Sequence, residues 1–138
     1  MAKRKDTVCV YNQTRQSFLS LSVRTADTTF SRLRGLIGRG RLKSGEGIWV
    51  KPSQGVHTIG LLFPIDVIYL DADNRVLLTV ENLGTFRISP VRSRCRSVLQ
   101  LAARTVYASG TLPGDQLLIC SPENMETCLT AKNVEILV

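Results

Sequence analysis

The sequence predicts a mostly β protein, a small closed or nearly closed barrel-like domain of short antiparallel strands with one or two short helices. Two observations lead to this class. Short runs of β-branched and aromatic residues recur along the chain and are separated by turn residues. No alternation of strands with long helical segments is present, although a parallel sheet would need one.

The first third of the chain predicts a two-stranded ribbon followed by a helix. Residues 7–12 and 18–23 are strand-like and can pair with each other. A capping residue at Asp27 or Thr28 precedes apolar residues at helical spacing, which favours a short helix that glycines end by Gly40.

The remainder predicts strands joined by turns and one helical stretch. Residues 65–70 form the strongest strand pattern, and the turn at 71–74 returns the chain as a hairpin. A helical turn is expected at 102–108, and Pro64, Gly114 and Asp115 are predicted to shape turns. Strands are expected at 47–50, 55–59, 65–70, 75–80, 98–101, 116–120 and 134–138.

Length and composition predict a single globular domain over residues 7–138, preceded by a basic disordered tail at residues 1–6. The chain has 138 residues, of which 43% are hydrophobic and 21% are charged. No apolar run approaches the roughly 20 residues that a membrane-spanning helix needs. No signal-peptide pattern follows the basic start, so a cytoplasmic location is expected.

The net charge of +7 lies in residues 1–41, and the rest of the chain is neutral overall. Two basic bands stand out, at residues 24–43 and 87–104. Such bands can contact an anionic partner or can be ordinary solvated surface. Nucleic acid is one such partner, although no nucleic-acid-binding motif is present. The anion-contacting candidates are Arg32, Arg39, Arg41, Arg92, Arg94 and Arg96.

The four cysteines predict free thiols that are mostly buried. Cys9, Cys95, Cys120 and Cys128 form no closely spaced pair of the metal-binding kind, and the chain has one histidine. A domain of this length in a reducing compartment does not need disulfides. We therefore expect no metal site and no cofactor.

The segment 57–71 holds the only histidine, His57, and a carboxylate, Asp66, inside an apolar run. A carboxylate there must find partners, because leaving it unpaired costs roughly several kcal/mol. We therefore predict that Asp66 is largely buried with at least two hydrogen bonds. His57 and Asp66 can form a structural pair, a binding site or part of a catalytic site, but no nucleophile motif accompanies them.

Two further side chains complete the candidate polar pocket of Arg34, Trp49, His57, Thr58 and Asp66. Arg34 can reach a buried carboxylate, either Asp66 or Asp115, or can help to form an anion site. Trp49 lies in an expected strand, where a core position is favoured over a stacking platform.

The order of these motifs resembles a bacterial and archaeal family known as domain of unknown function 192. The residues that carry the resemblance are Arg34-Gly35-Leu36, His57-Thr58-Ile59-Gly60, Pro64-Ile65-Asp66-Val67, Val98-Leu99-Gln100-Leu101 and Gly114-Asp115. The resemblance implies a compact, mostly β single domain and no established activity, cofactor or substrate. The chain departs from the family pattern at Ile37, at Leu61, at Gln100, where glutamate is usual, and at Arg104, where glycine is usual.

These observations favour a non-enzymatic binding or accessory module with a small polar pocket, whose ligand is a small molecule or a protein. The first alternative is a small hydrolase that uses His57 as general base. The second alternative is a basic protein that associates weakly and non-specifically with nucleic acid.

Overall fold

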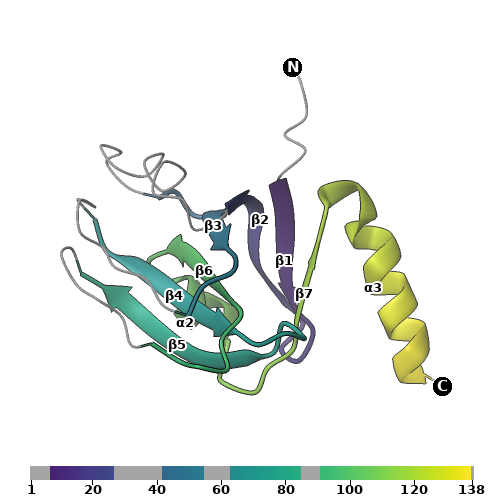
Figure 1. The fold of residues 1–138 in the computed structure, drawn as a ribbon. Coiled ribbons are helices and arrows are strands. Elements are labelled where there is room, and N and C mark those ends of the chain that lie inside the picture. The colour runs from purple at the N-terminus through teal and green to yellow at the C-terminus, as the bar shows by residue number, and fades with distance from the viewer. Residues whose placement is uncertain (1–6, 27–41, 55–62, 85–90, 138) are drawn as a thin grey trace.

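The computed structural model describes residues 7–26, 42–54, 63–84 and 91–137. Within these ranges, seven strands form one sheet that curls into a half-barrel (Figure 1). The mostly β class predicted from the sequence is therefore confirmed. The strands are β1 (Thr7–Asn12), β2 (Ser17–Ala26), β3 (Glu46–Val50), β4 (Ile65–Leu70), β5 (Val76–Leu83), β6 (Ser97–Ala102) and β7 (Leu117–Cys120), and the helices are α2 (Thr105–Ser109) and α3 (Pro122–Leu137).

The strand order across the sheet is β5-β4-β6-β3-β2-β1-β7. Neighbouring strands run antiparallel except for β2 and β3, which run parallel, so the expectation of antiparallel strands throughout was wrong at this pair. The connection between Ala26 and Glu46 is long enough to return the chain to the end of the sheet where β2 began. A parallel neighbour requires such a crossover, whereas a tight turn would have produced a hairpin.

Strand positions predicted from the sequence agree with the described strands. The limits of β1 and β4 are those expected, and the other five matching strands differ only at their ends. The expected helix at 27–40, the expected strand at 55–59 and the expected tail at 1–6 lie outside the described residues.

The interior of the half-barrel is an apolar cluster to which all seven strands contribute. Alternate residues of each strand face this interior, as the two-residue period of a strand requires. Val106 of α2 joins the cluster, so α2 covers the inner face of the sheet. The strand residues are Val10, Leu19, Val23, Trp49, Ile68, Leu70, Val76, Leu99, Leu101 and Leu117.

A second apolar cluster covers the opposite face of the sheet over β3, β4, β5 and β6. Phe63 and Cys95 come from connections and pack against Ile65, Val67 and Tyr69. Strand β4 is therefore buried on both faces along its whole length, which explains its nearly continuous apolar sequence. The exception in that sequence is Asp66.

The two edge strands approach each other at one corner of the half-barrel. The backbone amide of Val76 donates to the carbonyl of Asp115 at 2.8 Å, and the amide of Gly114 donates to the carbonyl of Val76 at 2.8 Å. Arg75 and Gln116 form an isolated bridge beside these bonds. This corner joins the start of β5 to the start of β7, and so draws the sheet partly closed.

Helix α2 begins and ends in left-handed backbone conformations. Arg104 precedes it with φ 77°, and Gly110 ends it with φ 71°. Glycine adopts this region readily, whereas a side chain is strained there. The departure from the family pattern at Arg104 thus falls where the backbone favours glycine. The Arg104 guanidinium lies 5.6 Å from the ring centre of Tyr107, within cation–π distance.

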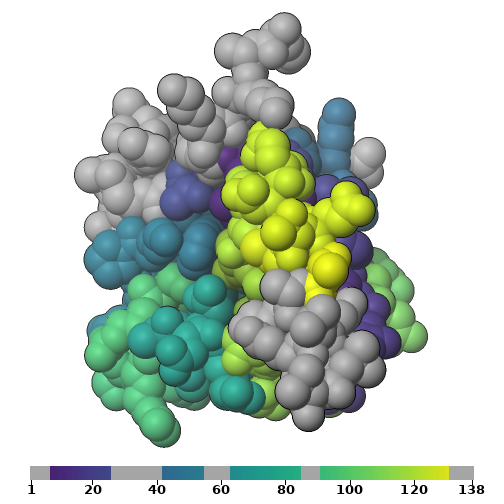
Figure 2. All heavy atoms as spheres, turned by 90° about the vertical axis from the view of Figure 1, so that its right-hand side faces the viewer, coloured from purple at the N-terminus to yellow at the C-terminus, as the bar shows by residue number. Residues whose placement is uncertain are grey.

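The chain ends in helix α3, so the strand expected at 134–138 was wrong. The β-branched residues there suggested a strand, but the preceding sequence starts a helix that continues through them to Leu137. Pro122 suits the first helical position, because the N–H that proline lacks would have no partner within the helix there. The negative charge of Glu123 in the first turn interacts favourably with the positive end of the helix dipole. Helix α3 packs against β1 and β7, and its residues 122–130 lie on the face shown in Figure 2, coloured yellow-green to yellow. No helix in the described ranges is long and apolar enough to span a membrane.

Gly47 allows the central strands to pack closely. A Cβ atom at this position would lie 2.6 Å from Cδ2 of Leu101 and 2.8 Å from the carbonyl oxygen of Gln100. We expect Gly47→Ala to lower the free energy of unfolding by about 1–3 kcal/mol, because β3 and β6 would have to move apart. Urea denaturation of both proteins measures the difference.

A double-mutant cycle with Leu101→Ala tests the cause of that loss. Removing Cδ2 of Leu101 relieves the closest contact, so the combined cost should be smaller than the sum of the two single costs. Strict additivity would contradict the steric explanation.

Candidate functional site

Asp66 is fully buried and accepts hydrogen bonds at both carboxylate oxygens, which confirms the expectation for this residue. The amide of Asn82 donates to Oδ1 at 2.8 Å, and the amide of Val106 donates to Oδ2 at 2.9 Å. The carboxylate therefore connects β4 to β5 and to α2.

Two local features bring these amides to Asp66. The β4–β5 register shifts between Ile65 and Val67, so β5 has an extra residue opposite Asp66. Asn82 lies in this bulge with φ 54°, a conformation that asparagine tolerates better than most residues. Val106 lies in the first turn of α2, where backbone amides have no partner within the helix.

Asp66 supplies the cap that α2 lacks in its own sequence. Arg104, at the N-cap position, makes no side-chain capping bond. A carboxylate near a helix N-terminus is favoured by the helix dipole as well as by the hydrogen bond. We interpret Asp66 as a structural anchor, because each of its oxygens already binds a backbone amide.

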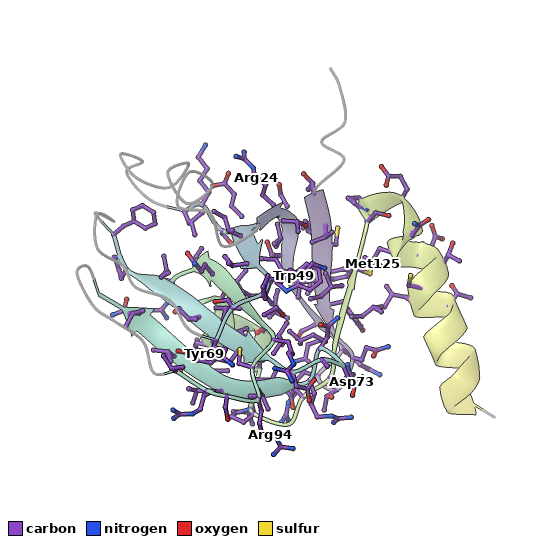
Figure 3. All side chains as sticks on the ribbon, viewed as in Figure 1. Arg24, Trp49, Tyr69, Asp73, Arg94 and Met125 are labelled. Atoms are coloured by element: carbon purple, nitrogen blue, oxygen red, sulfur yellow. The ribbon has the colours of Figure 1, made fainter. Side chains whose placement is uncertain are left out.

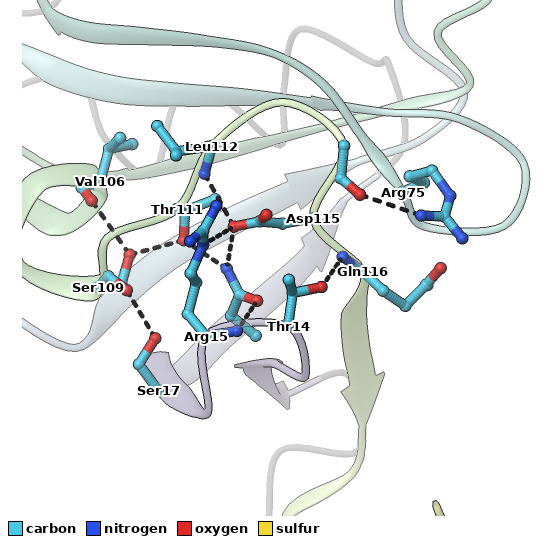
Figure 4. Close-up of polar contacts among 12 residues, drawn as sticks. Thr14, Arg15, Ser17, Arg75, Val106, Ser109, Thr111, Leu112, Asp115 and Gln116 are labelled. Carbon is cyan, nitrogen blue, oxygen red and sulfur yellow. Dashed lines mark hydrogen bonds and ion pairs between the residues drawn. The ribbon is translucent and has the colours of Figure 1, made fainter. Parts of the chain in front are cut away.

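A second buried carboxylate, Asp115, organises the corner where β5 meets β7 (Figure 4). Its Oδ2 accepts from Nδ2 of Asn12 at 3.0 Å, from Nε of Arg15 at 3.0 Å and from the amide of Leu112 at 2.9 Å. Asn12 also donates to Oγ1 of Thr111 at 3.0 Å. The network joins the end of β1 to the turn before β7.

The same network determines the ionisation of Asp115. Burial acts to raise its pKa, but hydrogen bonds from Arg15, Asn12 and the Leu112 amide, with the charge of Arg15, outweigh burial. The pKa of Asp115 is therefore held below its ordinary value. Among the described residues, Arg15 is the arginine that pairs with it. Arg34 lies outside those residues, so its pairing with a buried carboxylate stays a prediction.

Trp49 lies at the edge of the interior cluster and is 9% exposed (Figure 3). The Lys51 ammonium lies 3.9 Å from the centre of its ring, which is a cation–π contact. The indole Nε1 is buried and has no hydrogen-bond partner among the described residues. The core position favoured for Trp49 is thus the observed one, with one polar atom left unpaired.

A cleft of about 600 Å³ lies where β4 begins, β6 ends and the chain enters β3. Its described lining consists of three short segments, each next to a strand end: Leu42, Lys43 and Ser44; Phe63 and Pro64; and Ala102 and Ala103. The walls are mostly apolar, and Lys43 is exposed at the cleft. The size is that of a site for a small molecule.

The structure places the predicted site residues in different surroundings. Asp66 and Trp49 are buried and are absent from the described lining of the cleft, whereas Pro64 lies on it. Arg32, Arg34, Arg39, Arg41, His57 and Thr58 lie outside the described residues. Arg92, Arg94 and Arg96 are exposed in the segment before β6, and their role in anion contact stays a prediction.

Sequence reasoning missed most of the described cleft. Lys43, Ser44, Phe63 and Ala103 carry no motif, and three separate segments must meet before a cavity exists. One signal in the sequence could have pointed to the cleft. Each of the three segments lies close to the end of a predicted strand.

A family model matches residues 10–119, which is most of the chain and all the strands except the start of β1 and the last residue of β7. The chain belongs to the DUF192 family. This family is described as an uncharacterized ACR. The resemblance carried by the Arg-Gly-Leu, His-Thr and Pro-Ile-Asp-Val motifs is thereby confirmed.

Two solved structures share the fold. A protein of unknown function from Novosphingobium aromaticivorans is 21% identical, with a TM-score of 0.67 over 81% of this chain and 83% of its own. A Sinorhizobium meliloti protein described as a "putative transcription regulator" is 23% identical, with a TM-score of 0.67 over 86% of this chain and 95% of its own. No curated protein matches the chain. At these identities, the structural likeness shows the fold alone.

Proposed function

We propose that this DUF192 protein is a non-enzymatic binding module whose ligand occupies the cleft beside Leu42, Phe63 and Ala103. The cleft of about 600 Å³ carries this proposal, because it is large enough for a small molecule and is lined by segments next to the ends of three neighbouring strands. A site supported in this way can hold a ligand without a change in the sheet.

The lining favours a compact ligand with an apolar body and an anionic group. Leu42, Phe63 and Ala102 offer apolar surface. Lys43 supplies a positive charge, and Ser44 a hydroxyl that can donate. The amide of Lys43 donates to Oε1 of Glu46 at 2.9 Å, which fixes the backbone of this segment against β3.

Arg34, His57 and Thr58 are proposed to add polar contacts to the same ligand. Their segments precede Leu42 and Phe63 along the chain, and this closeness in sequence supports a place near the cleft. An arginine and a histidine would reinforce the preference for an anion that Lys43 suggests.

The surroundings of Asp66 support a binding role over the hydrolase alternative. A general base such as His57 needs an oriented second nitrogen, and Asp66 was the candidate to orient it. Both oxygens of that carboxylate already accept backbone amides. These bonds give the carboxylate a structural task in holding β5 and α2, which supports the binding role.

Binding of 1-anilinonaphthalene-8-sulfonate, an anionic aromatic dye, tests the proposal. We expect saturable fluorescence enhancement by the folded protein. Ala103→Trp should abolish it, because the new side chain fills the cleft, and Lys43→Glu should weaken it at least several-fold through charge reversal. Fluorescence titration at constant ionic strength measures both effects.

Ala108→Trp is the matched control, because Ala108 is exposed on α2 and is not part of the described lining. Lys51→Glu is the control for charge reversal, because Lys51 packs on the ring of Trp49 and neither residue is part of the described lining. Equal dye binding by the Ala103→Trp and Ala108→Trp variants would refute the cleft as the site.

A further inference from the structure

A second cavity lies at the corner where the β4–β5 turn meets the start of β7. Its volume is about 400 Å³, and its described lining shares no residue with that of the first cleft. Three segments form it: Gln13 after β1, Asp73 and Asn74 in the β4–β5 turn, and residues 116–119 at the start of β7. The volume is that of a site for one small molecule.

Hydrogen bonds hold the three segments of this cavity together. The backbone amide of Gln13 donates to the carbonyl of Gln116 at 2.9 Å, and the amide of Leu117 donates to the carbonyl of Asn74 at 3.0 Å. Nε2 of Gln116 donates to the carbonyl of Asp73 at 2.7 Å and to that of Leu117 at 3.1 Å. The cavity is therefore formed before any ligand enters it.

The polar side chains of the lining keep groups that have no partner within the described ranges. The carboxylate of Asp73 and the side-chain amides of Gln13 and Asn74 make no hydrogen bond there, because the bonds of Asp73 and Asn74 use backbone atoms. Nε2 of Gln116 is occupied, which leaves its Oε1 as an acceptor. A carboxylate only accepts, whereas an amide side chain both donates and accepts. Donors and acceptors thus lie side by side.

The backbone of β7 adds a donor and an acceptor at the same place. Opposite residues of an antiparallel pair alternate between bonded and non-bonded pairs, and Gln13 is bonded to Gln116. Along the register, Leu117 and Ile119 therefore point their N–H and C=O groups away from β1. The N–H of Leu117 already binds Asn74, so Ile119 presents its two groups at the edge of β7 that pairs with no described strand.

We propose that this cavity binds a neutral ligand with several neighbouring hydroxyl groups, such as a monosaccharide. A hydroxyl donates one hydrogen bond and accepts up to two, so adjacent hydroxyls match a lining that mixes a carboxylate, amides and backbone groups. Leu118 and Ile119, both partly buried, offer apolar surface to the C–H groups of the sugar ring.

The charges at this corner favour a neutral ligand over an ion. The carboxylate of Asp73 opposes an anion. Arg75, exposed and two residues further along the turn, balances that charge, and its guanidinium donates to the carbonyl of Gly114 at 3.0 Å (Figure 4). Within the described ranges, no group of three His, Cys, Asp or Glu side chains could hold a metal ion.

Titration of the ¹⁵N-labelled full chain with D-glucose, D-galactose and D-mannose tests the proposal. We expect at least one of these hexoses to shift backbone amide signals saturably, with the largest shifts at residues 73–74 and 116–119. Ala103→Trp, which fills the first cleft, should leave this binding unchanged. The two sites can therefore fail or succeed independently.

Asp73→Ala should weaken hexose binding at least several-fold, because it removes the carboxylate from an exposed turn position and leaves the sheet intact. Glu81→Ala is the matched control, since it removes an exposed carboxylate of β5 that is not part of the described lining, and it should bind as the original chain does. Circular dichroism of both variants checks that they fold.

Four outcomes would overturn the proposal. The first is the absence of saturable shifts with all three hexoses, and the second is shifts centred on Lys43, Ser44 and Ala103 in place of residues 116–119. The third is binding of D-glucosamine without binding of any neutral hexose, which would make the cavity a cation site. The fourth is tighter binding of glucose 6-phosphate than of glucose, which would show that the corner selects anions.

Discussion

Replacing Asp66 with alanine is expected to lower the free energy of unfolding by about 2–5 kcal/mol, the largest effect predicted for any single site. The substitution leaves the amides of Asn82 and Val106 without their acceptor. The Val106 bond is fully buried, so water cannot readily replace the carboxylate. Urea or thermal denaturation measures the loss.

Asp66→Asn separates hydrogen bonding from the loss of volume. The side chain keeps its shape, but one of its two ends becomes an NH₂ group that faces a backbone N–H in either orientation. A cost of about 2 kcal/mol is therefore expected even for this conservative change. Asp73→Ala, at an exposed position in the β4–β5 turn, should cost little. If Asp66→Asn were as stable as the original protein, the carboxylate would not be the anchor described above.

Replacing Asp115 with alanine is expected to cost about 2–4 kcal/mol. Three donors converge on its Oδ2, and one of them, Asn12, is fully buried. Asp115→Asn should cost less, because an amide oxygen can take the position of Oδ2 while the charge is lost. Denaturation of the two variants at neutral pH measures the difference between them.

The contribution of Asp115 should depend on pH in a defined direction. Its pKa is lower when the protein is folded than its ordinary value of 3.8. The stability that Asp115 adds is therefore fully present above about pH 4–5. It is lost as the pH falls through the pKa that Asp115 has in the folded protein. The difference between the original protein and Asp115→Asn should shrink in this acidic range. A difference that grew on acidification would show that the sign of the shift is wrong.

Much of the fold could be predicted from the sequence, because local pattern and burial agree along most strands. Strand β4 is the clearest example, since β-branched and aromatic residues on both faces specify a strand covered on both sides. The burial of Asp66 followed from the same pattern, since a carboxylate inside that strand cannot face water without exposing its neighbours.

The errors arose where the outcome depended on distant parts of the chain. The direction of β3 beside β2 is set by a crossover, not by either strand. Val134 and Ile136 favour a strand locally, but a helix already started at Pro122 extends through them more readily than it stops. The partners of Asp66 required a bulge in β5 and the start of α2, neither of which has a local signature strong enough to identify.

The pairing of β1 with β7 has a consequence for how the protein is made. About a hundred residues separate Asn12 from its partner Leu117. Translation proceeds at about 5–20 residues per second, so β7 is synthesised roughly 5–20 s after β1. During that time the edge of β1 that later pairs with β7 has no partner strand. During synthesis the nascent chain therefore exposes an unpaired strand edge beside Val10, and it is at this stage that protection by a chaperone would matter most.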